Sequence, residues 1–214
     1  SLREALSGRW GMLTEMIDSV RAQTYPHWEL CLVDGGSPDP VVWQTLQRYA
    51  AQDTRIRIQR FEQNLGISGN SNRALALVSG EFIALLDHDD TLAPFALYEV
   101  VKLLNTAPDL DFIYSDRDTM HKDGTRYLPL FKPQWSPDML FNANYLTHVC
   151  VLRATLMQQI GGFKPQSDGA QDWMLFLEAA TRTSRFEHIP QVLYHWREHS
   201  RSTSSGMRAK PYAA

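Results

Sequence analysis

The run Asp87-His88-Asp89-Asp90 places three carboxylates directly after the apolar stretch 82–86. A short apolar stretch of this kind predicts a buried strand, so the acidic groups are expected at the end of a strand. Negative charge there is unfavourable unless a cation or hydrogen-bond donors compensate it. Mg²⁺ and Mn²⁺ prefer oxygen ligands, and Mg²⁺ is often held by one or two carboxylates together with substrate phosphates. The run therefore indicates a site for a divalent cation and a phosphorylated ligand. The alternative is an aspartate-rich turn in which Asp90 or Thr91 caps the next helix.

Two other acidic positions follow predicted strands. Asp34 precedes Gly35 and Gly36, which would let the backbone approach a ligand closely. An ordinary Asp-Gly turn fits the same residues equally well. Asp116 and Asp118 follow the apolar stretch 112–114 and are interpreted as turn residues, unless a substrate cleft lies at that end of the strand.

Two groups near the end of the chain could also do chemistry. Asp172 begins a predicted helix, where the helix dipole alone favours a carboxylate. It could equally act as a general base that takes a proton from an acceptor hydroxyl. His195, Arg197 and His199 form a polar cluster after a predicted strand. This cluster could close on a diphosphate or could be purely structural.

The segments that must position these residues alternate between helix and strand patterns. Helices are predicted over 13–20, 42–50, 74–78, 94–105 and 171–180, and strands over 28–33, 56–61, 82–86, 112–114, 149–152, 186–189 and 192–196. This alternation predicts an α/β fold with a mostly parallel sheet covered by helices on both faces. Ligands of such sheets bind at the carboxyl ends of the strands, and three predicted strand ends carry aspartate: Asp34, Asp87 and Asp116.

Composition narrows the class of protein. The chain has 214 residues, enough for one domain with a full core, and a formal charge of -3, which argues against a nucleic-acid binder. Its longest apolar stretch is far too short to span a membrane, and no signal-peptide pattern opens the chain. Cys31 and Cys150 lie among apolar neighbours and are interpreted as buried free thiols in a reducing compartment. The expected location is the cytoplasm.

An ordered series of motifs spans residues 13 to 204. It comprises residues 19–30, 33–37, 64–68 with Asn72, 79–82, 85–90, 114–116, 131–133, 161–163, 171–172 and 194–197. The series resembles the family-2 glycosyltransferases of the GT-A fold, which has a Rossmann-like central sheet flanked by helices and a less regular acceptor-side half. The ordered set is far more specific than any single motif in it.

The resemblance implies an inverting transfer of a hexosyl or deoxyhexosyl group from a nucleoside-diphosphate sugar, assisted by Mn²⁺ or Mg²⁺. The acceptor would be a hydroxyl group of a saccharide or lipid-linked saccharide, as in polysaccharide assembly at the inner face of a membrane. Asp172 matches the catalytic base. Asp87 would contact the nucleoside and Asp89 the metal.

The resemblance also suggests roles for the remaining candidates. Asp34 would line the nucleobase pocket, and Asp116 and Arg197 would contact the donor. His199 looks like the C-terminal metal or diphosphate contact, with His195 as second choice. Gly35 is a departure, because many relatives have a second aspartate there that helps to hold the base. That difference leaves the donor base open and permits impaired activity.

The domain organisation follows from the same comparison. Residues 13–204 would form the glycosyltransferase domain and 205–214 a polar tail. Residues 1–12 are predicted to form a helical segment. Nothing strand-like precedes the helix at Leu13, although a parallel α/β domain usually opens with its central strand. We therefore expect missing residues between Trp10 and Gly11.

Two alternatives remain open. Residues 85–92 also resemble the Asp-x-Asp-x-Thr strand end of a haloacid-dehalogenase-type phosphatase, although that family carries it on its first strand. A catalytically impaired module that only binds a nucleotide or carbohydrate is the other alternative, motivated by Gly35 and the absent first strand.

Overall fold

The computed structural model describes residues 11–198. The expected helical segment up to residue 10, the junction at Trp10, His199 and the tail 205–214 lie outside this range. Residues 11 and 12 belong to the first described helix, and the domain boundary expected at residue 13 stays a prediction. Within the described range no helix is long and apolar enough to cross a membrane.

The first half alternates helices and strands. Its elements are α2 (Gly11–Arg21), β1 (Leu30–Asp34), α3 (Pro40–Gln52), β2 (Ile56–Arg60), α4 (Gly66–Leu75) and β3 (Phe82–Leu85). Local sequence signals explain where α3 begins. Asp39 accepts a hydrogen bond from the Val41 amide and Pro40 opens the helix, so the start of α3 is capped as a proline-initiated helix should be.

The second half is richer in strands. Its elements are β4 (Thr91–Leu92), α5 (Ala96–Thr106), β5 (Phe112–Met120), β6 (Arg126–Leu130), α6 (Pro137–Asn142), β7 (Cys150–Arg153), α7 (Ala154–Ile160), the 3₁₀ turn η1 (Pro165–Ser167), α8 (Gln171–Ala180) and β8 (Phe186–Arg197). Residues 122–125 join β5 and β6 as a hairpin.

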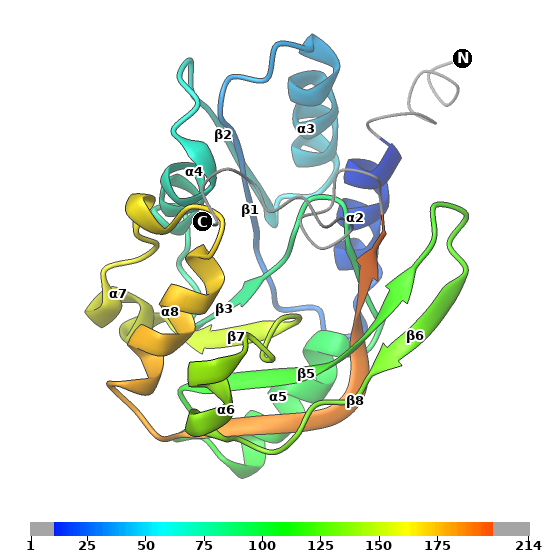
Figure 1. Cartoon of the computed structure of the whole chain (residues 1–214). Helices are drawn as coiled ribbons and strands as arrows, with labels where there is room; N and C mark the ends of the chain where they lie inside the picture. Colours follow the sequence, from blue (N-terminus) through cyan, green and yellow to red (C-terminus); the bar gives the residue numbers. More distant parts are fainter. Residues whose placement is uncertain (1–10, 199–214) are drawn as a thin grey trace.

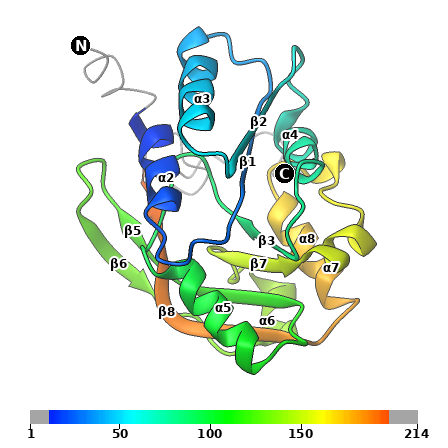
Figure 2. The same cartoon turned by 180° about the vertical axis from the view of Figure 1, so that it is seen from behind.

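The strands form two separate sheets (Figures 1 and 2). The strands β1 and β2 pair in parallel, and a second sheet has the order β3-β7-β5-β8-β4, with β6 on β5. Only β5 and β8 are parallel in the second sheet, because β7 returns after the β5–β6 hairpin and inserts antiparallel between β3 and β5. The α/β class is confirmed, but the mostly parallel sheet is corrected to a mixed one.

Three predicted elements have different limits. Asp116 and Asp118 lie inside β5 rather than in a turn, because their carboxylates are bonded to His188 and His195 of the parallel strand β8. The two predicted C-terminal strands form one strand, β8, with an irregular register. The helix α4 covers Gly66–Leu75, whereas the predicted helix covers 74–78, so both ends of the helix lie earlier in the chain than predicted. Its only buried residue is Ser68, so apolar periodicity could not locate it.

Helices cover both faces of the larger sheet. The helix α5 packs on one face, whereas α6 and α8 lie on the other (Figures 1 and 2). The apolar cluster beneath α6 to α8 is centred on Phe112, Leu152 and Phe176, which are almost fully buried. A second cluster joins α2, α3 and α5 to the strands. The loops at the strand ends therefore rest on two packed cores.

Asn72 ties α4 to the second half of the fold. Its amide nitrogen donates to the Phe163 carbonyl and its amide oxygen accepts from the Phe163 amide, both at 2.8 Å. Gly162, with φ +73, has no room for a side chain, because a Cβ atom would lie 2.5 Å from the same amide oxygen. This paired bond explains why Asn72 and the glycine pair 161–162 occur together in the motif series.

We expect Asn72→Ala to lower the free energy of unfolding by about 1–3 kcal/mol, because it leaves both backbone groups of Phe163 without their partner. Urea denaturation measures this change. Asn142→Ala is the matched control, since Asn142 is also helical but exposed and bonds only the Asp138 carbonyl of its own helix. Its effect should stay within about 0.5 kcal/mol. Equal losses for the two variants would contradict the assigned role.

Candidate functional site

The acidic run forms the loop between β3 and β4. Asp90 is only 1% exposed, and its two carboxylate oxygens accept hydrogen bonds from the Tyr194 hydroxyl (2.6 Å) and the Arg197 amide (2.7 Å). The alternative that Asp90 or Thr91 caps a helix is wrong, because Thr91 lies in β4 and α5 begins only at Ala96. Asp90 instead fastens the run to β8.

Arg197 also holds this loop in place. Its guanidinium donates to the Asp89 carbonyl at 2.7 Å and pairs with Glu15 of α2, and the residue is 2% exposed. The structure therefore brings Arg197 to the acidic run, but through the backbone of Asp89 and the buried carboxylate of Asp90. Its predicted contact with the donor stays a prediction.

His148 joins the acidic run, although nothing in the sequence singled it out. The antiparallel register pairs Leu85 with Cys150, so residues two beyond and two before this pair meet across the strands. His148 Nε2 lies 4.0 Å from a carboxylate oxygen of Asp87, and the imidazole stacks on the Tyr194 ring at 4.8 Å between centroids. Strand pairing, which brings together residues far apart in the chain, is the signal that could have found it.

A buried lysine holds the segment that carries His148. Lys132 Nζ donates to the carbonyls of Leu146 (2.8 Å) and His148 (2.9 Å). Burial, together with the positive charges of Lys132 and Arg117, lowers the pKa of His148 to about 3. The imidazole is therefore neutral at pH 7, which is the form that binds metal ions.

Among the described residues, the fold brings together a group of potential metal ligands. One ligand atom from each of Asp87, Asp90 and His148 lies within 4.8 Å of the others. Burial raises the pKa of the Asp90 carboxyl to about 6, against the effect of its hydrogen bonds. Desolvation and the charges of the neighbouring carboxylates raise the pKa of Asp87 as well. Because 61% of the Asp87 side chain is exposed, water reaches this carboxyl and limits the effect of desolvation on its pKa. Repulsion by the neighbouring carboxylates is therefore the cause of the raised pKa that we retain.

Asp172 lies on the same side of the molecule, in the first turn of α8. Desolvation raises the pKa of its carboxyl above the ordinary value, and its charge is among those that raise the pKa of Asp87. Asp87 and Asp172 also line one cavity. The structure therefore brings the predicted base and the acidic run together.

Two other predicted site residues, Asp34 and His195, are engaged elsewhere. Asp34 accepts from the Ser37 amide at 2.8 Å and pairs with Arg60 at 3.2 Å, which closes the turn after β1. His195 bonds Asp118 at 2.7 Å, and its other ring nitrogen lies 3.2 Å from a guanidinium nitrogen of Arg126. Neither belongs to the group of potential metal ligands, and their predicted roles stay predictions.

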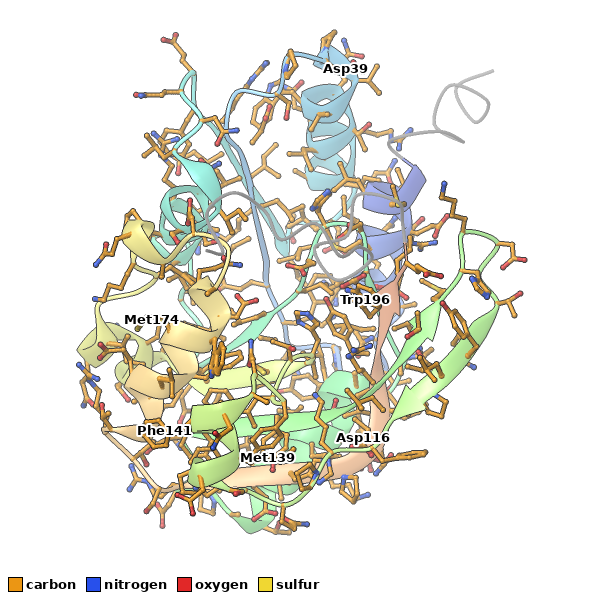
Figure 3. All side chains as sticks on the ribbon, in the orientation of Figure 1. Asp39, Asp116, Met139, Phe141, Met174 and Trp196 are labelled. Atoms are coloured by element: carbon orange, nitrogen blue, oxygen red, sulfur yellow. The ribbon has the colours of Figure 1, made fainter. Side chains whose placement is uncertain are left out.

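Asp116 is also held inside the fold. Its carboxylate accepts from the Lys132 amide and bonds the His188 ring, both at 2.8 Å. Figure 3 shows Asp116 on the side formed by β5 and β8, away from Met174 of α8, the helix that carries Asp172. Asp116 thus anchors the segment that contains Lys132, and its predicted donor contact is untested.

Gly35 lies against α4. A Cβ atom at this position would lie 2.6 Å from the amide nitrogen of Asn70, which in turn donates to Asn64 at 2.8 Å. An aspartate here would require the Asn70 side chain to move. The Asn70 side chain therefore occupies the space that an aspartate at position 35 would need.

The chain is similar to known proteins over most of its length. A model of the family described as Glycosyl transferase family 2 matches residues 7–159. The chain is 45% identical over 204 residues to the uncharacterized protein y4gI of Sinorhizobium fredii, which covers 94% of this chain and 22% of that protein. It is 37% identical over 193 residues to the O-antigen biosynthesis protein RfbC of Myxococcus xanthus, which covers 90% of this chain and 15% of that protein. The chain thus spans less than a quarter of the length of either relative.

Solved structures agree on the fold. S. aureus TarS 1–349 in complex with UDP-GlcNAc superposes with a TM-score of 0.75 at 20% identity, over 91% of this chain and 57% of that one. The likeness shows that the two chains share their α/β fold.

The crowding of carboxylates predicts a dependence of stability on pH when no divalent cation is present. Asp90 and Asp87 bind protons more tightly in the folded than in the unfolded chain. Their contribution to the free energy of unfolding is therefore fully present below the unfolded pKa, near pH 4. It falls as pH rises through about 6, the pKa of Asp90.

Asp87→Asn should reduce the fall in the free energy of unfolding with rising pH, because it removes one of the repelling charges. At pH 8 it should stabilise the cation-free chain by up to about 1 kcal/mol, which is the repulsion of two charges roughly 4 Å apart in a water-like medium. Urea denaturation at pH 5 and pH 8 in the presence of EDTA measures both values. Asp109→Asn, at an exposed carboxylate, is the control for removing one charge. A loss of stability at pH 8 in Asp87→Asn would show that the carboxylates do not repel one another.

Proposed function

The chain, which has the GT-A fold, belongs to glycosyl transferase family 2, and we propose that it transfers a sugar from a nucleoside-diphosphate sugar to a hydroxyl group of a saccharide or lipid-linked saccharide. The observation that carries the proposal is the convergence of Asp87, Asp90 and His148 beside Asp172. Such a group can place a cation and a phosphorylated leaving group next to a carboxylate base.

A divalent cation is the cofactor that this group would hold. The exposed Asp87 and the neutral imidazole of His148 are the proposed donors from this group. Asp89 lies outside the group and is proposed as a further ligand because the family resemblance suggests it. Carboxylate oxygens suit both Mn²⁺ and Mg²⁺, so the acidic run would supply the main ligands and His148 a further one. A bound cation would stabilise the negative charge that develops on the departing diphosphate.

Asp172 is the proposed general base. Its raised pKa brings it closer to neutral pH, where a base is most effective, while leaving the carboxyl able to take a proton from an acceptor hydroxyl. The hydroxyl oxygen would then form a bond to the anomeric carbon as the bond to the diphosphate breaks. Attack on the face opposite the leaving group inverts the configuration at that carbon.

The remaining residues are proposed for donor recognition. Asp34 would line the nucleobase pocket, and Asp116 and Arg197 would support the donor side of the cleft. His199, with His195 as second choice, is proposed as a contact of the metal or diphosphate. Uridine diphosphate sugars are the first donors to test, because TarS, which shares the fold, was crystallised with UDP-GlcNAc.

The two alternatives differ in their support. A haloacid-dehalogenase-type phosphatase would carry its aspartates on the first strand, whereas Asp87 follows β3, with β1 and β2 ahead of it. The family match also gives the phosphatase no support. A module that binds a nucleotide without transferring a sugar remains the competing hypothesis, and the following prediction separates it from the enzyme.

We expect Asp172→Asn to lower kcat for release of nucleoside diphosphate by about 10²–10⁴-fold, the usual contribution of a general base. The affinity for the nucleotide should change little, because the donor side is untouched. The measurement is nucleoside diphosphate release from a panel of nucleotide sugars with Mn²⁺, with and without saccharide acceptors, and nucleotide binding by calorimetry.

Asp138→Asn is the matched control, since Asp138 also lies in the first turn of a helix but is exposed. Its kcat should equal that of the native chain. Native binding of nucleotide without any release would favour the non-catalytic module. Unchanged kcat in Asp172→Asn would remove Asp172 from its proposed role.

His148→Ala is expected to weaken Mn²⁺ binding roughly tenfold or more, equivalent to about 1.4 kcal/mol, through loss of a neutral nitrogen donor. Titration of Mn²⁺ in the presence of UDP, followed by electron paramagnetic resonance, measures the affinity. His121→Ala is the control, because His121 is exposed and stacks on Tyr127 in the hairpin. If Asp89→Ala abolishes binding while His148→Ala leaves it unchanged, His148 is not a ligand.

A further inference from the structure

The segment between α7 and α8 is fixed to one side of α4 (Figures 1 and 2). Ser68 and Asn72 make the contacts, and they share a face of α4 because they lie four residues apart. Asn72 bonds both backbone groups of Phe163. The Ser68 hydroxyl donates to the Lys164 carbonyl at 3.1 Å, and Ser68 is 0% exposed. The helix α4 thus holds the beginning of the segment that leads to Asp172.

Asp168, at the end of this segment, binds the N-terminus of α4. Its carboxylate accepts a hydrogen bond at 2.9 Å from the amide of Ser68, in the first turn of the helix. Leu65, at the N-cap position, makes no side-chain hydrogen bond, so Asp168 replaces a capping side chain. Gly66, with φ +75, leaves room for the carboxylate, because a Cβ atom there would overlap one of its oxygens. Hydrogen bonding to Ser68 also lowers the pKa of the Asp168 carboxyl, which favours its charged form at the positive end of the helix dipole.

Asp168 is also part of the turn that leads into α8. The Ala170 amide donates to the Ser167 carbonyl at 2.8 Å, which closes the turn. Asp168 has φ -53 and ψ 124, and Gly169 has φ +101. These angles are close to those of a type II β-turn, whose third residue needs a positive φ and is therefore usually glycine. Ala170, the N-cap residue of α8, makes no side-chain hydrogen bond, so the turn holds the backbone before α8 without a capping side chain.

Gln171 connects this turn to Asp172. Its side-chain oxygen accepts a hydrogen bond from the Gly169 amide at 2.7 Å, and its side-chain nitrogen donates to a carboxylate oxygen of Asp172 at 3.4 Å. Desolvation raises the pKa of Asp172, and the bond from Gln171 acts in the opposite direction. A series of contacts therefore runs from the N-terminus of α4, through Asp168 and the turn, to the carboxylate of Asp172.

We infer that Asp168 is a positioning residue, which holds the turn before α8 against α4 so that Gln171 directs the Asp172 carboxylate into the cavity that it shares with Asp87. The inference rests on the proposed function, because it concerns the placement of the proposed base. Asp168 acts through the Ser68 amide and not on the substrate. An uncharged side chain with an oxygen in the same place should therefore serve equally well.

The test compares Asp168→Ala with Asp168→Asn in the release of nucleoside diphosphate from the nucleotide-sugar panel with Mn²⁺ and acceptors. Asp168→Ala should lower kcat roughly 10–100-fold, because a shift of about 1 Å at a catalytic group can cost a factor of a hundred. The KM for the donor should stay nearly constant, since Asp168 binds α4 and not the nucleotide. Asp168→Asn should keep most of the native kcat, because asparagine caps a helix about as well as aspartate.

Asp53→Ala is the matched control. Asp53 is also a partly buried carboxylate that accepts a backbone amide, that of Arg55 at 3.1 Å. It lies just before β2, at the end of the smaller sheet opposite to Asp34. Both alanine variants should lose some stability in urea denaturation, whereas only Asp168→Ala should have a low kcat at a temperature where both are folded.

Gln171→Ala gives a second measurement that does not require Asp168→Ala to fold. It should also lower kcat, and the double variant should lose no more than the worse single variant, because both residues act along one series of contacts. Losses that multiply in the double variant would overturn the inference. An unchanged kcat in either alanine variant, or equal losses in Asp168→Ala and Asp168→Asn, would overturn it too. A native chain that releases no nucleoside diphosphate would instead overturn the proposed function, and the inference with it.

Discussion

The burial of Asp90 is the constraint on which the candidate site depends. A carboxylate that is 1% exposed must have hydrogen-bond donors, and both of its donors, the Tyr194 hydroxyl and the Arg197 amide, come from β8. The acidic loop is thereby fixed to β8, which pairs with β5 and β4 in the larger sheet. The Tyr194 ring then provides the surface on which His148 stacks. One buried carboxylate thus determines where two further residues of the site lie.

Asp87 and Asp90 are both aspartates of the acidic run, but they have different roles because one is exposed and the other is buried. Asp90 is enclosed and holds the backbone, whereas 61% of the Asp87 side chain is exposed and can reach a ligand. Lys132 makes a comparable contribution on the opposite side. Its buried ammonium holds the Leu146 and His148 carbonyls. Burial of the imidazole, and after it the positive charge of Lys132, lower the pKa of His148 and keep this nitrogen donor neutral beside a negative loop.

Local patterns in the sequence predicted the parts of the fold that depend on local interactions. The helix α8 has the predicted limits, and β3 ends within one residue of the prediction, because apolar periodicity and flanking residues determine both. The site residues Asp87 and Asp172 could be selected for the same reason. His148 could not, since only the register of β3 with β7 brings it to Asp87. The inner position of Asp116 was missed because its partner is His188.

The edge strand β3 leads from the larger sheet into the candidate site. Its last residues lead directly into the acidic run, and its only partner among the described strands is β7, which carries the register that places His148. A strand with one partner has half of its backbone groups unpaired and opens more readily than a central strand. The position of Asp87 relative to His148 therefore depends on four residue pairs between β3 and β7.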